Sequence, residues 1–235
     1  TRGGGYFVII VPSRGGPERE LLEIPRLGGL GVGRALAWSA DSGSLFVGTI
    51  PSAHGSTAIT PVDVATGEMR RITTPADGTQ GDSLPVVSPD GRMLAFVRRS
   101  GIQTGEANVL RLSAALGPIG EPFPIGRKGL FYHGMAWSAD GRDLIVSSGN
   151  TGDIGLWRIP LDHPDRPERL SPPGEECRQP TVAMQQGRLA FTRASWDENI
   201  WRLTLSAPGR PAGGPAALIG STRLELNAQF SPDGS

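Results

Sequence analysis

The chain has 235 residues, and because 23 Lys and Arg balance 23 Asp and Glu, its formal net charge at pH 7 is zero. This balance excludes a general attraction to nucleic acid, so we expect no direct nucleic-acid contact. No apolar stretch is long enough to span a bilayer, so we expect no membrane insertion by this segment. The single cysteine, Cys177, excludes an internal disulfide and any multi-cysteine metal site.

A turn motif recurs along the chain. It reads AWSADSGSLFVGT from residue 37, PVVSPDGRMLAFVRR from 85, AWSADGRDLIVSS from 136, TVAMQQGRLAFTR from 181 and AQFSPDGS from 228. Equivalent positions lie about 46 to 50 residues apart, a period that marks a propeller or a solenoid. The sequence is therefore an array of similar units.

Each unit has a second half that also recurs. Segments such as IGLWRIPLDHPDRPERLS show an apolar run, a turn rich in Gly and Pro, and a short run that ends near Leu or Ile. With the two strands around the turn motif this gives four strands per unit, which predicts the antiparallel meander of a propeller blade. The 34 Gly and 21 Pro suit many tight turns, and no segment keeps a helical period, so helix should be nearly absent.

We therefore predict an all-β chain that forms one β-propeller domain, or a fragment of one, from four-stranded antiparallel blades. The expected complete blades span residues 33–73, 83–125, 133–171 and 180–219, with partial blades at 6–25 and 227–235. The parent propeller is expected to have six or more blades, with a five-bladed ring completed by the two termini as the alternative. The recurrent Trp38 and Trp137, and likewise Trp157 and Trp201, are expected to pack between blades.

The aspartates of the turn motif have two possible roles. Asp41, Asp90, Asp140 and Asp233 could be metal ligands or catalytic acids, but an Asp-Gly pair is also a common hairpin turn. The unit at 181 has Gln-Gln-Gly at this place. That change would break a ring of ligands but still permits a turn, because glycine supplies the positive backbone angle. We interpret these aspartates as turn residues.

Motifs for enzymatic chemistry are sparse. The sequence has no Gly-x-Ser-x-Gly elbow and no His-x-x-x-His pair, and its three histidines lie far apart. GLGVG at 29–33 is not followed by a helical pattern that would bind phosphate. SADSGSLF at 39–46 resembles the Asp-box of sialidases, but it is the same turn as in the other units. We predict no catalytic residue, no metal site and no cofactor.

The segments SPDGRMLAFVRRS, SADGRDLIVSS and VIIVPSRGGPERELLEI resemble the WD-like repeat of the TolB family. The resemblance implies a propeller over nearly the whole chain, as in TolB and in propeller domains of bacterial transmembrane transcriptional regulators and sensor kinases. It implies a non-enzymatic binding or sensory scaffold within a larger signalling protein, in the periplasm or another extracytoplasmic space. The alternative is the non-catalytic propeller of a prolyl-oligopeptidase-type peptidase, which would gate substrate access.

A protein or small-ligand partner is expected at the face where the fourth-to-first and second-to-third strand connections surround the channel mouth, because loops on a rigid scaffold usually carry function. These connections supply the predicted binding residues: His54, Arg98, Arg99, Tyr132, His133, Asn150, Asp153, Arg193, Trp196, Asp197 and Glu198. The simpler alternative is that they are only solvated loop residues. Trp196 beside Arg193 and Asp197 favours a site, because Trp and Arg are common in interface hot spots. The competing location is the opposite face, around DHPDRP.

Overall fold

The computed structural model describes residues 6–24, 36–50, 55–101, 104–150, 152–184, 187–195 and 199–220, together with 229 and 231. Within these ranges the chain forms β-strands and no helix, so no helix there is long and apolar enough to cross a membrane. The chain divides into two compact units, residues 1–192 and 193–235, and each is described by itself. The expected partial blade at 227–235 lies outside the described residues, except for 229 and 231.

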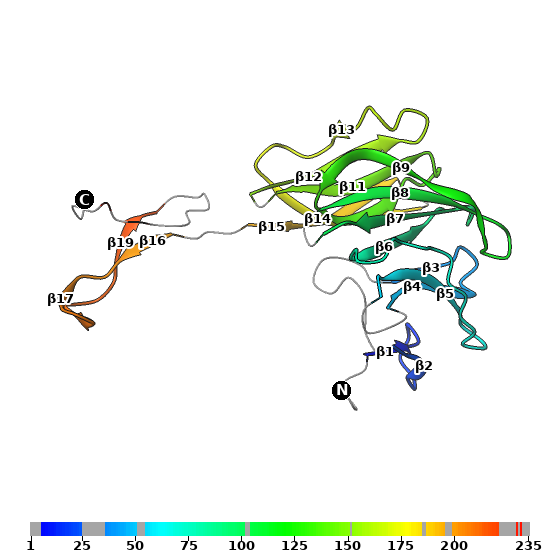
Figure 1. The fold of residues 1–235 in the computed structure, drawn as a ribbon, viewed down its shortest axis with the longest axis horizontal. Coiled ribbons are helices and arrows are strands. Elements are labelled where there is room, and N and C mark those ends of the chain that lie inside the picture. Colours follow the sequence, from blue (N-terminus) through cyan, green and yellow to red (C-terminus); the bar gives the residue numbers. More distant parts are fainter. Residues whose placement is uncertain are drawn as a thin grey trace. The chain divides into compact units, whose positions relative to one another are not determined.

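The described strands of the first unit form successive sheets along the chain (Figure 1). The first sheet pairs β1 (Tyr6–Ile10) with β2 (Arg19–Ile24). The second contains β3 (Leu36–Trp38), β4 (Ser44–Thr49) and β5 (Ala58–Asp63). The third contains β6 (Gly81–Val87), β7 (Met93–Arg99), β8 (Gly105–Leu112) and β9 (Pro118–Leu130). The fourth contains β10 (Tyr132–Trp137), β11 (Asp143–Asn150), β12 (Asp153–Pro160) and β13 (Glu168–Arg169). The fifth pairs β14 (Glu176–Ala183) with β15 (Arg188–Ala194), whose last two residues are counted with the second unit.

The third and fourth sheets are four-stranded antiparallel meanders, in which each strand pairs with the one before it in sequence. The second sheet has three strands in the described residues, and a single β-bridge between Val62 and Met69 stands where a fourth strand would pair. The register shifts near the start of both β6 and β10, where a bulge re-aims the side chains of the first strand. These meanders have the connectivity that the repeat predicts.

Residues 180–219, the expected fourth blade, have a different arrangement. β14 and β15 form one pair, whereas in the second unit β16 (Ile200–Arg202) pairs with β19 (Ala216–Ile219) and β17 (Leu205–Ala207) pairs with β18 (Arg210–Pro211). The side chains of β15, β16 and β19 are mostly exposed. Because propeller blades are held partly by burial against their neighbours, these strands lack that support within the described residues.

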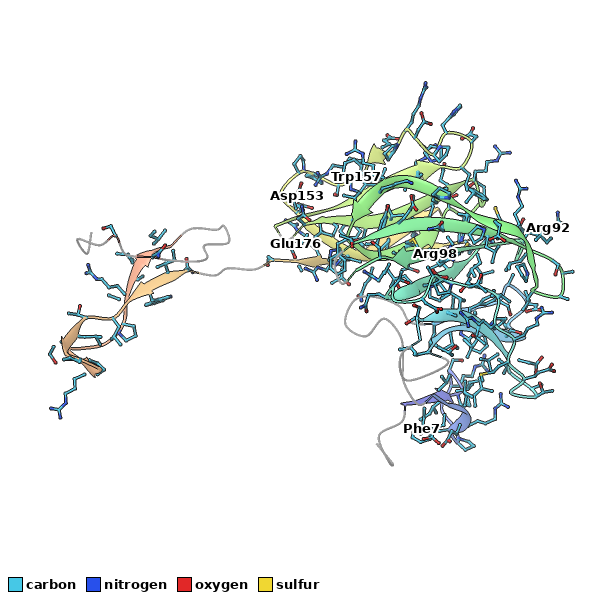
Figure 2. All side chains as sticks on the ribbon, in the orientation of Figure 1. Phe7, Arg92, Arg98, Asp153, Trp157 and Glu176 are labelled. Atoms are coloured by element: carbon cyan, nitrogen blue, oxygen red, sulfur yellow. The ribbon has the colours of Figure 1, made fainter. Side chains whose placement is uncertain are left out.

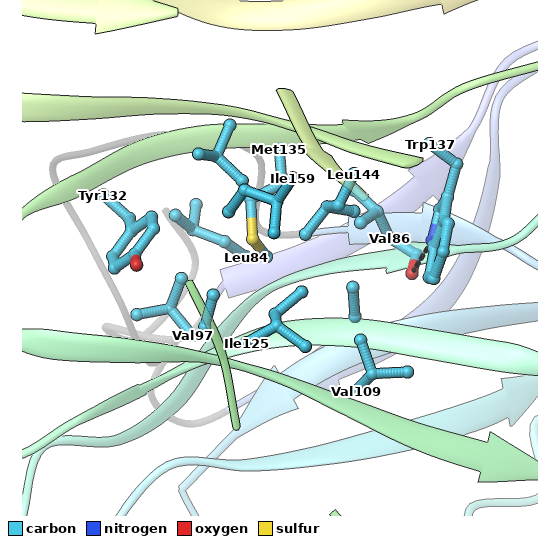
Figure 3. Packing of buried hydrophobic residues seen from close by; sticks show 13 residues of the cluster. Leu84, Val86, Val97, Val109, Ile125, Tyr132, Met135, Trp137, Leu144 and Ile159 are labelled. Carbon is cyan, nitrogen blue, oxygen red and sulfur yellow. Dashed lines mark hydrogen bonds between the residues drawn. The ribbon is translucent and has the colours of Figure 1, made fainter. Parts of the chain in front are cut away.

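Hydrophobic side chains fill the space between successive sheets of the first unit. One cluster joins the first and second sheets and includes Val8, Leu45, Val47 and Val62. Another joins the second and third sheets and includes Phe46, Ile59, Leu94, Phe96 and Leu110. The largest joins the third and fourth sheets and includes Leu84, Val97, Ile125, Met135, Trp137 and Leu144 (Figure 3). Burial between sheets, rather than one central core, therefore holds the unit together.

The Asp-Gly turns are closed by their own side chains. In the turn between β10 and β11, Asp140 Oδ1 accepts hydrogen bonds from Ser138 Oγ at 2.7 Å and from the N–H of Arg142 at 3.1 Å. Ser138 Oγ in turn accepts from the N–H of Asp143 at 2.9 Å. The same bonds are made in the turns that contain Asp41 and Asp90. These three carboxylates bend the chain, which confirms their interpretation as turn residues, while Asp233 lies outside the described residues.

These hydrogen bonds predict a loss of stability in acid. The serine hydroxyls, followed by backbone N–H groups, lower the pKa of Asp41, Asp90 and Asp140 below the ordinary value of 3.8. A carboxylate with a lowered pKa stabilises the fold above its unfolded-state pKa, and this contribution is lost as the pH falls through its folded-state pKa. We therefore expect the free energy of unfolding to decrease as the pH falls from about 4 toward 2, when it is measured by urea titration.

Serine variants test this prediction. The double variant Ser88→Ala, Ser138→Ala should show a shallower acid decrease, because two of the three aspartates lose their strongest donor. Ser113→Ala is the control: its Oγ accepts from the N–H of Gly117 at 3.0 Å, and no carboxylate of the described residues bonds to it. That variant should lose the same free energy at pH 7 and at pH 3. An acid slope that is identical in the wild type and the double variant would contradict the prediction.

Candidate functional site

A pocket of about 190 Å³ lies between the third and fourth sheets, at the strand ends remote from the Asp-Gly turns. Leu130, Val146, Trp157 and Ile159 supply apolar walls, and Arg127, Asn150 and Asp153 supply polar groups. Tyr132 also lines it. The pocket thus brings together three of the predicted binding residues, Tyr132, Asn150 and Asp153, from two different connections. Figure 2 shows Asp153 toward one end of the strands of the first unit and Arg92, in the β6–β7 turn, at the other.

One face of β12 contributes both a polar group, Asp153, and apolar groups to the pocket. Because side chains alternate along a strand, Asp153, Gly155 and Trp157 share a face. Arg169, the register partner of Trp157, lies along it: its guanidinium forms an ion pair with Asp153 and lies 5.4 Å from the centre of the Trp157 ring. A Cβ at Gly155 would be 3.0 Å from this guanidinium, so the glycine makes room for it. Hydrogen bonds from Arg169 and from the N–H of Gly174 hold the pKa of Asp153 below 3.8.

Tyr132 and Arg127 complete the wall around Trp157. The Tyr132 hydroxyl donates to the carbonyl of Arg127 at 2.8 Å, and burial raises the pKa of this hydroxyl to about 12. The Arg127 guanidinium lies 5.6 Å from the centre of the Trp157 ring, and Trp157 Nε1 donates to the carbonyl of Ser148 at 3.3 Å. The indole is therefore held by a hydrogen bond and by contact with two guanidinium groups.

Arg98, at the end of β7, is tied to a buried acid. Its Nε and Nη2 donate to the two carboxylate oxygens of Asp82 at 2.8 and 3.0 Å, and the Asp82 side chain is fully buried. The hydrogen bond to Asp82 raises the pKa of Arg98. This residue neutralises a buried carboxylate between β6 and β7, with 34% of its side chain exposed.

Arg99, Tyr132 and His133 are buried, which corrects the expectation that they belong to open loops at the channel mouth. Arg99 Nε donates to Ser83 Oγ at 2.8 Å, and its Nη2 donates to the carbonyl of Tyr132 at 3.1 Å. Residues of β10 contact the third sheet on one side and β14 on the other. Because the strand is covered from both sides, polar residues near its start are buried together with its apolar ones.

The other predicted residues are placed only in part. Asn150 is exposed at the end of β11, opposite Asp153 in the register. Arg193 is the first residue of the second unit. His54, Trp196, Asp197 and Glu198 lie outside the described residues. A role for these residues in binding stays a prediction.

A wider groove of about 670 Å³ lies at the opposite ends of the third and fourth sheets; Asp162 of the segment DHPDRP lines this groove, whereas Pro167 of the same segment lines the smaller pocket. Its lining includes Phe123, Arg142, Arg158 and Asp162. Arg158 bonds to Asp143 and Glu168 at 2.9 and 3.2 Å. This groove mixes charged residues, among them the Arg158–Asp143 pair, with apolar residues such as Phe123, whereas the walls of the smaller pocket are mainly apolar.

Sequence patterns did not single out Arg127 and Arg169, and they assigned Trp157 to packing alone. The alternation Asp153, Gly155, Trp157 was a usable signal for one shared polar face. The choice of Arg169 as its partner depends on the β12–β13 register. In the described ranges, no three His, Cys, Asp or Glu side chains gather closely enough to hold a metal ion.

The stacked antiparallel meanders define a β-propeller fold, and solved structures share it. TolB from Acinetobacter baumannii is similar over 97% of this chain and 52% of its own, with 19% identity and a TM-score of 0.64. A prolyl endopeptidase is similar over 90% of this chain and 30% of its own, with 19% identity and a TM-score of 0.56. A periplasmic gluconolactonase from Pseudomonas aeruginosa is similar over 97% of this chain and 69% of its own, with 18% identity and a TM-score of 0.54.

This chain spans about half the length of the TolB structure. No family model matches it, and no curated protein matches it. The likeness to solved structures therefore establishes the fold, which proteins of different activity share.

Proposed function

We propose that the chain is a non-enzymatic, TolB-like binding scaffold whose pocket between the third and fourth sheets receives one apolar side chain of a protein partner. The size of the pocket carries this proposal. Its volume of about 190 Å³ is close to the ~150 Å³ of a cavity that holds a benzene ring, and below the ~300–1,000 Å³ of small-molecule sites. Apolar walls with a polar rim are the usual anatomy of an interface hot spot.

The ionisable groups of the pocket support binding rather than catalysis. A general acid or base works best with a pKa near the working pH. The pKa of Tyr132 is raised to about 12, and the pKa of Asp153 is lowered by its ion pair with Arg169. Both groups therefore keep one protonation state at neutral pH, and both are already engaged in hydrogen bonds.

The wider context is part of the same proposal. The scaffold would belong to a larger bacterial signalling protein, such as a transcriptional regulator, in an extracytoplasmic compartment; the similarity to TolB and to a periplasmic gluconolactonase supports this placement. The similarity to a prolyl endopeptidase favours a second candidate, a propeller that gates a hydrolase. The coding sequence on either side separates the two: a membrane span with a winged helix or kinase favours sensing, and a nucleophile elbow favours the peptidase.

Matched tryptophan variants test the pocket. Heptapeptides selected from a random display library on the wild-type chain should contain a recurrent apolar anchor residue. Leu130→Trp adds a ring at the pocket wall and should weaken these peptides roughly tenfold or more. Asp162→Trp adds the same ring to the wider groove at the opposite strand ends and should leave their affinity unchanged. Fluorescence anisotropy measures the affinities, and thermal unfolding checks that both variants are folded.

Two results would overturn the proposal. If Asp162→Trp weakened the peptides while Leu130→Trp did not, the binding face would be the opposite one. If the purified chain hydrolysed a lactone or a prolyl peptide with a turnover that a point mutation abolished, the scaffold would be an enzyme.

A further inference from the structure

A second polar cluster lies where β7, β10 and β14 meet. Arg99 and His133 are 6% and 4% exposed, and Arg178 has a side chain that is 26% exposed. Arg99 Nη1 and Arg178 Nε are buried without a hydrogen-bond partner among the described residues, and the two ring nitrogens of His133 are buried with only a weak contact to the backbone of Gly149. Buried polar groups are nearly always satisfied, if not by protein then by water or an ion. So many unpaired nitrogens in one cluster need an explanation.

Several contacts place these side chains together. Arg99 Nη2 bonds to the carbonyl of Tyr132, the neighbour of His133. The Arg99 guanidinium lies 5.2 Å from the centre of the Phe131 ring, and the rings of Phe131 and His133 are 4.4 Å apart, edge to face. On the other side, a Cβ at Gly134 would lie 2.8 Å from the Cα of Gln179, so β10 and β14 approach closely beside His133 and Arg178.

The charges of this cluster do not balance. Arg178 Nη2 donates to Glu176 Oε2 at 2.8 Å, so this acid neutralises one arginine, and Glu176 Oε1 also accepts from the N–H of Gly152 at 2.6 Å. Arg99 donates to Ser83 Oγ and to a carbonyl, and it forms no ion pair with any acid in the described part of the chain. A buried cation without a counter-ion is costly.

His133 is neutral at pH 7. Burial lowers its pKa to about 4, and the charges of Arg178 and Arg99 act in the same direction, whereas the Gly149 backbone and Glu176 raise it. Neutral imidazole offers one N–H donor, and protonation would add a second donor and a positive charge. The two arginines lower the pKa of His133, so a bound anion would raise it again.

We propose that Arg99, His133 and Arg178 bind one small oxyanion, a carboxylate or phosphate group, from solution. Each arginine keeps one buried nitrogen unpaired here, so the proposed donors come from three strands rather than from one bidentate fork. The anion would supply the missing negative charge and accept from the unpaired N–H groups. Its affinity should rise as the pH falls, because anion binding and protonation of His133 favour each other.

The imidazole signals of His133 provide the test, with the exposed His163 as a reference in the same spectrum. Sodium phosphate and sodium acetate are titrated separately into the intact chain at constant ionic strength. Either salt should shift the His133 signals saturably and raise its pKa by about one unit or more, with His163 unchanged. The salt with the lower dissociation constant identifies the group as phosphate or carboxylate.

Arginine variants decide whether the effect is specific. Arg99→Gln and Arg178→Gln should each raise the dissociation constant roughly tenfold or more, since each removes a charged donor. Arg142→Gln, in the β10–β11 turn, should leave it unchanged. If a glutamine variant does not fold, the lysine variant keeps the charge but loses the guanidinium geometry, and it should weaken binding as well.

The absence of a saturable shift at His133 with both salts would overturn the proposal, as would an equal shift in the wild type and in the Arg99 and Arg178 variants. The pocket is tested by peptide binding to the Leu130→Trp variant, and the anion site by salt titration of the arginine variants. The anion site can therefore fail or stand independently of the proposed function.

Discussion

Replacing Trp137 by alanine is expected to lower the free energy of unfolding by about 3–5 kcal/mol. Trp137 is 1% exposed and belongs to the cluster that joins the third and fourth sheets (Figure 3). Its Nε1 donates to the carbonyl of Val86, across the two sheets, at 3.1 Å. Alanine would leave a cavity between the sheets and a buried carbonyl without its donor. Urea unfolding followed by far-ultraviolet circular dichroism measures the loss.

Two further variants separate the contributions of packing and hydrogen bonding at this position. Trp137→Phe keeps most of the ring but loses the N–H, and should cost about 1–3 kcal/mol. Trp38→Ala changes the same position of the motif, where the side chain is 48% exposed, and should cost only about 1 kcal/mol. Equal losses for Trp38→Ala and Trp137→Ala would show that Trp137 does not join the sheets as described.

The turns and the meander could be predicted from the sequence because the interactions that form them are local. Asp140 bonds within its own turn, and each strand of a blade pairs with its neighbour along the chain. The burial of the two tryptophans could not be predicted in this way. Trp137 packs on β6 of the preceding sheet, whereas the sheet before Trp38 contains only β1 and β2 in the described residues.

The positions of the predicted binding residues likewise could be predicted where they depend on local pairing, and could not where they depend on contacts between sheets. Asn150 and Asp153 face each other at the end of the β11–β12 hairpin, a place that the sequence pattern marks directly. The pairing of Arg98 with Asp82 follows from the β6–β7 register. A bulge interrupts this register, and the sequence pattern does not predict the bulge. Polar residues at a strand start suggest a solvated loop, but His133 is enclosed because another blade covers each side of β10.

Apolar lining was the hardest part of the site to foresee. Leu130 ends β9 of one sheet, and Trp157 lies in β12 of the next, so their meeting in one pocket depends on how two blades stack. The sequence repeat predicts the order of the blades, but it does not predict the size or lining of a pocket between two of them. The pocket therefore depends on the packing of two sheets, whereas Asn150 and Asp153 of its polar rim are brought together by one hairpin.

The Gly81→Ala variant is expected to lose more than about 3 kcal/mol of unfolding free energy, and the Gly78→Ala variant only about 1–2 kcal/mol. Both glycines have left-handed backbones, with φ of 82° and 76°. At Gly81 a Cβ would overlap the backbone of Thr57, where a bridge and a 2.7 Å bond from the N–H of Asp82 to the Thr57 carbonyl join the second and third sheets.

At Gly78 no atom of the described residues lies within 4 Å of the added Cβ, so alanine there costs only the strain of the backbone. The difference between the two variants therefore measures the close approach of the two sheets, because the backbone term is common to both. Backbone atoms cannot rotate aside as a side chain would, so relief of the overlap at Gly81 requires the sheets to separate. Urea unfolding and amide hydrogen exchange at Asp82 report the loss, and equal destabilisation by the two alanines would rule out the tight contact at Thr57.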